Sequence, residues 1–88
     1  MKYSIEFLKQ AHKASIFNKS KILNTNSCAC FCCKEILSTT EIKEFIEEID
    51  GKDETATCPS CGIDSIIDDI FPINDPIFLE EMSKYWFE

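Results

Sequence analysis

Two closely spaced pairs of cysteines constrain this chain more than any other feature of its sequence. The first pair is Cys30 and Cys33, and the second is Cys58 and Cys61, within Cys-Pro-Ser-Cys-Gly. A C-x-x-C turn directs two sulfurs and several backbone N–H groups toward one point. Two such turns facing each other therefore supply the four thiolates of a tetrahedral structural zinc site. The sequence thus predicts a domain that folds around one Zn²⁺ held by these four cysteines.

The length of the chain agrees with a stabilising metal. A domain of 88 residues buries only about 60–65% of the surface of its unfolded chain, and small domains often add disulfides or a metal. The N-terminal residues show no secretory signal, and no apolar run approaches the ~20 residues needed to cross a bilayer. We therefore expect a single cytoplasmic zinc-binding domain over residues 1–88, with no membrane segment and with reduced thiols that hold metal rather than form disulfides.

Residues 38–51, between the two cysteine pairs, have the pattern of an amphipathic helix. Ser38 and Glu41 match a capping box, and Gly51 supplies a C-terminal stop. The spacing i, i+3, i+4, i+7 predicts one buried stripe between these signals, formed by Ile42, Phe45, Ile46 and Ile49. The sequence therefore predicts a helix whose two ends are fixed by the metal.

Three further segments have helix signals. Ser4 can cap a helix over residues 4–15, and Asn18 can cap a short one over residues 19–23. Asp75 followed by Pro76 is a specific start signal for a C-terminal helix with an aromatic stripe. Residues 63–71 are too few for periodicity to separate a strand from a helical turn. These signals predict a small α+β, mostly helical fold, in which two C-x-x-C knuckles flank an amphipathic helix and the terminal helices pack around them.

Two cysteines and one histidine lie outside the predicted ligand set. The Cys28-Ala29-Cys30 step leaves open a shifted set that uses Cys28, but we favour Cys28 and Cys32 as small buried or half-exposed side chains. His12 is expected on the apolar face of the first helix, as a structural residue. The clustered carboxylates after the second knuckle are interpreted as a solvated acidic surface, formed by Asp64, Asp68 and Asp69.

Iron is the alternative metal. The paired C-x-x-C turns also resemble those of rubredoxin, an electron carrier whose iron is held by four thiolates, and ligand type does not separate the two metals. The aromatic-rich β core of rubredoxin is not evident, and a charged segment lies between the cysteine pairs instead. Zinc is therefore favoured over iron.

Four separated blocks of sequence also agree, in order, with one family. They are Ser15-Ile16-Phe17-Asn18, Cys28-x-Cys30-Phe31-x-Cys33, Thr57-Cys58-Pro59-x-Cys61-Gly62-Ile63-Asp64-Ser65 and Lys84-Tyr85-Trp86-Phe87. Over nearly its whole length the chain resembles a family of small bacterial cytoplasmic proteins, from which it departs at Cys32. The resemblance implies a cytoplasmic zinc-knuckle protein, similar in class to zinc ribbons and treble clefs. It implies no particular activity, because these folds host many roles.

The charge of the chain bears on its partners. Sixteen acidic residues against nine basic ones give a net charge of −7, which disfavours binding to nucleic acid. Four cysteine ligands fill the coordination sphere of zinc and leave no position for a substrate. We therefore predict a non-enzymatic zinc-binding protein that acts as a protein-interaction module through an acidic helical surface, with another protein, including a basic one, as its partner. The first alternative is a phage-type anti-defence inhibitor or immunity protein that neutralises a basic enzyme such as a nuclease. The second is a rubredoxin-like iron electron carrier.

Overall fold

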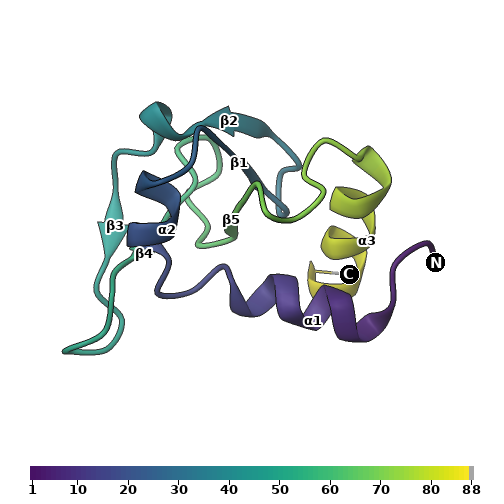
Figure 1. Cartoon of the computed structure of the whole chain (residues 1–88), viewed down its shortest axis with the longest axis horizontal. Coiled ribbons are helices and arrows are strands. Elements are labelled where there is room, and N and C mark those ends of the chain that lie inside the picture. Colours follow the sequence, from purple (N-terminus) through teal and green to yellow (C-terminus); the bar gives the residue numbers. More distant parts are fainter. Residues whose placement is uncertain (88) are drawn as a thin grey trace.

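A three-stranded antiparallel sheet divides the molecule into two layers (Figure 1). The computed structural model describes residues 1–87. In this sheet β1 lies between β2 and β5, and a second antiparallel sheet consists of β3 and β4. The strands are β1 (Ser27–Cys30), β2 (Ile36–Ser38), β3 (Phe45–Ile46), β4 (Thr55–Ala56) and β5 (Ile66–Asp68), and the helices are α1 (Ile5–Lys13), α2 (Lys19–Leu23) and α3 (Pro76–Phe87).

Alternation along β1 and β5 builds a separate core on each face of the sheet. Successive side chains of a strand point to opposite faces, so Ala29 and Ile67 face one core while Cys28, Cys30 and Ile66 face the other. The first core lies against α1 and α3 and contains Leu8, Ala11, Ala29, Phe31, Ile67, Ile73, Phe78, Leu79 and Met82. The second contains Ile22, Cys28, Cys30, Leu37, Ile42, Ala56, Cys58 and Ile66. The cysteine pairs therefore belong to the layer opposite the two long helices.

The terminal helices begin where the sequence predicts. Ser4 Oγ accepts a hydrogen bond from the Phe7 N–H at 3.1 Å, and Asp75 Oδ1 accepts one from the Ile77 N–H at 3.0 Å, with Pro76 as the first residue of α3. The predicted stripe of α3 is core only in its first half: Phe78, Leu79 and Met82 are buried, whereas Trp86 is partly buried and Tyr85 is exposed. Among the described residues, no helix is both long and apolar enough to span a membrane.

The predicted helix over residues 38–51 is wrong, and with it the mostly helical fold class. The capping box forms, because the Ser38 N–H donates to the Glu41 carboxylate at 2.8 Å, but the turn extends only over Thr39–Glu41 and is a 3₁₀ turn. The chain then runs out into β3, which pairs with β4. In a helix, Glu44 would lie next to three other glutamates. Glu41 and Glu47 are three residues from it and Glu48 is four, and like charges at these spacings repel. Pairing with β4 avoids this repulsion and still buries Ile42 in the second core.

Asn18 precedes α2 as expected, but its side chain makes no capping hydrogen bond. Its Nδ2 instead donates to the Ala14 carbonyl at 3.0 Å and to the Ile66 carbonyl at 2.8 Å, and its Oδ1 accepts from the Ala56 N–H at 2.9 Å. Asn18 is 1% exposed. This one amide therefore joins the chain after α1 to β4 and to β5.

A polar cluster joins the N-terminus to the start of α3. Lys2 Nζ lies 2.7 Å from Asp75 Oδ2, and the Tyr3 hydroxyl donates to the same oxygen. The backbone N–H groups of Lys2 and Tyr3 both donate to the Glu81 carboxylate, at 2.7 and 3.0 Å. The hydrogen bonds from Lys2 and Tyr3 lower the pKa of Asp75 to about 2, from an ordinary value of 3.8.

This cluster predicts a specific loss of stability in acid. Because the pKa of Asp75 is lower in the folded than in the unfolded chain, its stabilising effect is complete above pH 4 and is lost as the pH falls from about 4 to about 2. The Asp75→Asn variant keeps an oxygen that can cap α3 but has no charge to lose. Its free energy of unfolding, measured with urea between pH 5 and 2, should therefore fall less steeply than that of the wild type.

Asp50→Asn is the matched control, since Asp50 is exposed in the loop between β3 and β4. It should follow the wild-type acid profile. Protonation of the cysteine cluster affects the stability of all three proteins alike. The difference between the acid profiles therefore reports the contribution of the Asp75 charge to stability. Parallel profiles for the wild type and Asp75→Asn would contradict this role.

Candidate metal centre

The structure brings the four predicted cysteines to one point. Their sulfurs all lie within 4.8 Å of one another, with Cys30 Sγ 3.6 Å from Cys61 Sγ and Cys33 Sγ 3.8 Å from Cys58 Sγ. Cys30 ends β1 and Cys58 follows β4, and both are buried, whereas Cys33 and Cys61 are exposed. The cluster therefore has a buried inner side and a solvent-facing outer side.

These separations fit four thiolates around one ion. Zn–S bonds of about 2.3 Å in a tetrahedron place the sulfurs about 3.8 Å apart, close to both measured pairs. A disulfide needs an S–S distance of about 2.05 Å, and all six cysteines are free. The four clustered cysteines could hold one metal ion, and this set of sulfur ligands suits zinc or iron.

The two knuckles have the same backbone hydrogen bonds. In each, the N–H of the first cysteine, Cys30 or Cys58, donates to the carbonyl five residues later, in both cases at 3.0 Å. Its carbonyl in turn accepts from the N–H four residues later, Lys34 at 2.7 Å or Gly62 at 2.8 Å. The cysteine tetrad is therefore assembled from two copies of one turn, whose first cysteines are 28 positions apart in the sequence.

Backbone N–H groups of the turns lie near the two inner sulfurs. Burial alone raises the pKa of Cys58, but the N–H groups of Cys61 and Ser60, with the neighbouring thiols, bring it below the usual value. The Ser60 N–H lies 3.4 Å from Cys58 Sγ. At Cys30 burial dominates and raises the pKa, although backbone N–H groups of the same turn again oppose it. Converging N–H groups favour negative charge, so the backbone of the turns favours thiolates, and burial opposes them most strongly at Cys30.

Ser65 is a neighbour of the cluster that sequence reasoning did not single out as a site residue. Its Oγ lies 3.1 Å from Cys30 Sγ, and the side chain is buried. A hydroxyl in this position can orient a ligand sulfur, as partners behind metal ligands commonly do. Its only sequence signal is its place four residues after Cys61, within the block shared with the resembled family.

The residue after the second cysteine has a left-handed backbone in both knuckles. Gly62 has φ +79°, as its glycine suggests, but the equivalent residue of the first knuckle is Lys34, with φ +65°. A side chain with a Cβ is strained in this region. The sequence gives no sign of this strain, because lysine is not a residue typical of left-handed turns.

Lys34→Gly should therefore stabilise the protein. Relief of backbone strain is worth about 1–2 kcal/mol, and the entropic cost of glycine is about 0.5–1 kcal/mol. The difference is a gain of about 0–1.5 kcal/mol. Gly62→Ala is the matched opposite change: a Cβ there would meet nothing within 4 Å, so its cost of about 1 kcal/mol comes from the backbone alone. Urea unfolding of the metal-loaded proteins measures both. Destabilisation by Lys34→Gly would contradict the equivalence of the two turns.

The spare cysteines lie outside the tetrad. Cys28 is buried in β1, where burial followed by nearby acidic groups raises its pKa to about 11. Cys32 is half-buried against the second core. Both thus fit the interpretation as packing residues rather than ligands.

His12 and the three clustered aspartates also lie outside the tetrad. His12 is exposed rather than buried on the apolar face of α1, but its ring stacks on Trp86 at a centroid distance of 3.9 Å, which fits a structural role. Asp64 and Asp69 are exposed as expected, but Asp68 is buried in β5, where its backbone pairs with Cys28, so the expectation of a solvated side chain is wrong there.

Comparison with protein-family models, with curated proteins and with solved structures finds no significant match to this chain. The resemblance to small bacterial cytoplasmic proteins therefore stays a prediction. The role of the chain has to be inferred from its own residues.

Proposed function

We propose that the tetrad of Cys30, Cys33, Cys58 and Cys61 holds one structural Zn²⁺ and that the protein acts by binding another protein. The observation that carries the proposal is the set of sulfur separations, which fits one tetrahedral ion. Four thiolates complete such a sphere, so the metal has no open position for a substrate. The ion then stabilises the fold, and the protein acts through its surface.

The place of the tetrad in the fold supports a structural role. Cys30 is the last residue of β1 and Cys33 lies in the connection from β1 to β2, whereas Cys58 and Cys61 lie in the connection from β4 to β5. A metal shared by these turns would fasten the two sheets together beside the second core, to which Cys30 and Cys58 belong. A metal site in this position contributes directly to the free energy of folding.

The proposed interaction surface is acidic but differs from the one expected from sequence. Residues 41–54 contain seven acidic side chains and two lysines, and they form β3 and the loop that leads to β4 rather than a helix. The hairpin of β3 and β4 projects from the body of the molecule (Figure 1). An acidic projection of this kind suits binding to a basic protein surface. The same feature supports the alternative proposal, an inhibitor of a basic enzyme such as a nuclease.

Two measurements test the proposal. Native mass spectrometry and elemental analysis should give one zinc per chain, with no visible absorption from iron. Cross-linking of the zinc-loaded protein in its source cells should then recover one protein at stoichiometric yield, and chelator-treated protein should not recover it. One iron per chain with reversible redox behaviour would instead support the electron carrier, and metal-dependent turnover of a substrate would overturn the non-enzymatic role.

A further inference from the structure

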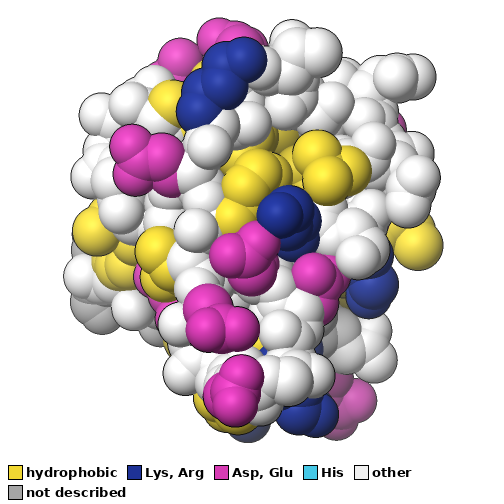
Figure 2. Space-filling view, turned by 90° about the vertical axis from the view of Figure 1, so that its left-hand side faces the viewer, with side chains coloured by type: hydrophobic (Ala, Val, Ile, Leu, Met, Phe, Trp, Pro, Cys, Tyr) yellow, Lys and Arg dark blue, Asp and Glu magenta, His cyan; other side chains and the backbone are white. Residues whose placement is uncertain are grey.

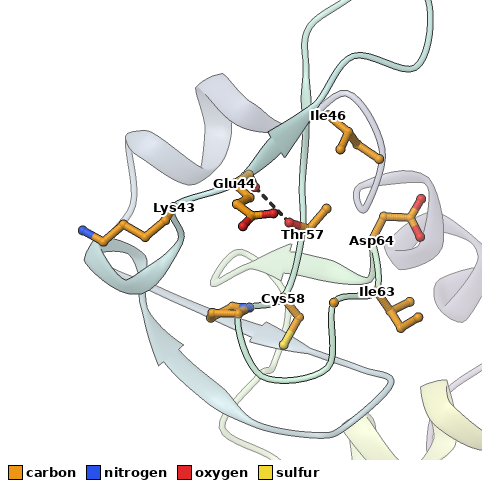
Figure 3. Close-up of a pocket in the computed structure, with 9 residues that line it drawn as sticks. Lys43, Glu44, Ile46, Thr57, Cys58, Ile63 and Asp64 are labelled. Carbon is orange, nitrogen blue, oxygen red and sulfur yellow. Dashed lines mark hydrogen bonds between the residues drawn. The ribbon is translucent and has the colours of Figure 1, made fainter.

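A groove lies beside the second knuckle, on the outer face of the small sheet (Figure 3). It has a volume of about 680 Å³. One wall comes from β3 and the end of β4, and the other from the turn that contains the cysteine pair and the residues after it. The lining residues are Lys43, Glu44, Ile46, Thr57, Cys58, Pro59, Gly62, Ile63 and Asp64.

The inside of the groove carries aliphatic surface that the fold leaves uncovered. Ile46 is 41% exposed and Ile63 is 39% exposed, and Pro59 is also exposed. On this side of the molecule, hydrophobic side chains gather near the centre of the face and are bordered by acidic and lysine side chains (Figure 2). These exposed aliphatic groups offer a surface on which the stem of a partner's side chain can pack.

The charged groups of the groove are mainly acidic. Glu44 and Asp64 lie on either side of Thr57, whereas the Lys43 ammonium points away from the other labelled side chains (Figure 3). Within residues 1–87, none of the ion pairs involves Glu44 or Asp64. The hairpin that forms one wall adds the acidic surplus of residues 41–54. The groove therefore offers carboxylates to a cationic group.

Thr57 fixes the shape of the wall between these carboxylates. Its N–H and its hydroxyl both bond to the Glu44 carbonyl, each at 3.1 Å. These bonds continue the pairing of β3 with β4 up to the knuckle, so the Glu44 backbone is held relative to Cys58. The acidic wall and the metal-binding turn are thus parts of one connected structure.

We propose that this groove binds an arginine side chain presented by a protein partner. Arginine has an aliphatic stem that packs on apolar surface while its charged end stays in water, which suits a groove lined by Ile46 and Ile63 together with Glu44 and Asp64. Its guanidinium makes directed, charge-assisted hydrogen bonds to carboxylates, unlike the point charge of lysine. The inference rests on the proposed protein-binding function and names its surface and the chemistry of its partner.

The probe for the test is the peptide acetyl-Ala-Leu-Arg-Leu-Ala-amide, compared with the same peptide carrying citrulline in place of arginine. Citrulline keeps the shape of the side chain and removes its charge. Titrated into ¹⁵N-labelled, zinc-loaded protein, the arginine peptide should shift amide signals of residues 43–46 and 57–64, and the citrulline peptide should bind at least tenfold more weakly. Equal binding of the two peptides, no binding, or shifts centred elsewhere would overturn the proposal.

Matched substitutions test the groove itself. Ile46→Lys places a positive charge in the groove and should weaken binding of the arginine peptide at least tenfold. Ile77→Lys makes the same change on α3, where Ile77 is 47% exposed, and should leave binding unchanged. Unchanged binding by Ile46→Lys, or equal weakening by both variants, would contradict the proposed site.

The peptide test and the cellular cross-linking can fail separately. If a stoichiometric protein partner is recovered but the arginine peptide does not bind, the groove proposal is wrong and the protein-binding function stands. If the peptide binds in the groove with the expected charge dependence but no partner is recovered, the groove is supported and the cellular function is not.

Discussion

Replacing Cys58 with serine is expected to abolish metal binding and to remove the cooperative unfolding transition at 25 °C. Cys58 is a buried member of the tetrad and joins the second knuckle to the second core. Structural zinc is worth about 10–16 kcal/mol in zinc-finger peptides, which is comparable with the about 5–15 kcal/mol total stability of a domain. Elemental analysis after gel filtration measures the metal, and urea unfolding followed by near-ultraviolet circular dichroism measures the transition.

The spare cysteines provide the controls for this experiment. Cys32→Ser should keep one metal per chain and change the free energy of unfolding by less than about 1 kcal/mol, because the side chain is only half-buried. Cys28→Ala should keep the metal and cost about 1–2 kcal/mol for a small cavity. A Cys58→Ser protein that retained one metal and unfolded like the wild type would show that the tetrad is not the metal site.

Asn18→Ala is expected to lower the free energy of unfolding by about 3–5 kcal/mol. The substitution removes three hydrogen bonds and leaves two carbonyls and one N–H of the backbone without their partner. A buried polar group that loses its partner costs about 1–3 kcal/mol. The loss should appear in urea unfolding of the metal-loaded protein, with metal content unchanged.

Asn24→Ala is the matched control for Asn18. Asn24 is exposed and makes one local hydrogen bond, from Nδ2 to the Ser20 carbonyl at 2.8 Å. Its loss should cost less than about 1 kcal/mol. If the two alanine variants lost similar amounts of stability, Asn18 would not be the junction between α1, β4 and β5 that its contacts indicate.

Features set by short stretches of sequence could be predicted. The starts of α1 and α3 depend on residues within one turn, Ser4 and Asp75 with Pro76, and these signals are confirmed. Each cysteine pair forms a local turn, so both knuckles could be predicted from short stretches of sequence. The meeting of Cys30, Cys33, Cys58 and Cys61 is long-range, but it could be predicted because one tetrahedral ion needs four ligands.

Features decided by distant partners could not be predicted. The capping box at Ser38 forms, yet the helix stops after one turn because pairing with β4 and charge repulsion outweigh its periodicity. Asn18 has the sequence context of an N-cap, but its partners Ala56 and Ile66 are far along the chain. The strain at Lys34 follows from the geometry of the knuckle and not from the residue type.

Because the protein has two cores, we expect loss of the metal to destabilise one layer of the fold before the other. The core of α1, α3 and one face of the sheet contains none of the tetrad cysteines, whereas the opposite core contains Cys30 and Cys58. We therefore expect metal removal to expose the layer of β3, β4 and the knuckles first, with α1 and α3 losing their packing as the shared sheet is released.

The most direct test of this account is thermal unfolding of reduced protein with and without its metal. Protein stripped with a chelator under reducing conditions should lose its cooperative transition or melt more than about 20 °C lower, and one equivalent of Zn²⁺ should restore the original curve. If the stripped and reduced protein melted as cooperatively and at the same temperature as the untreated protein, the metal would not support the fold, and the central claim would be wrong.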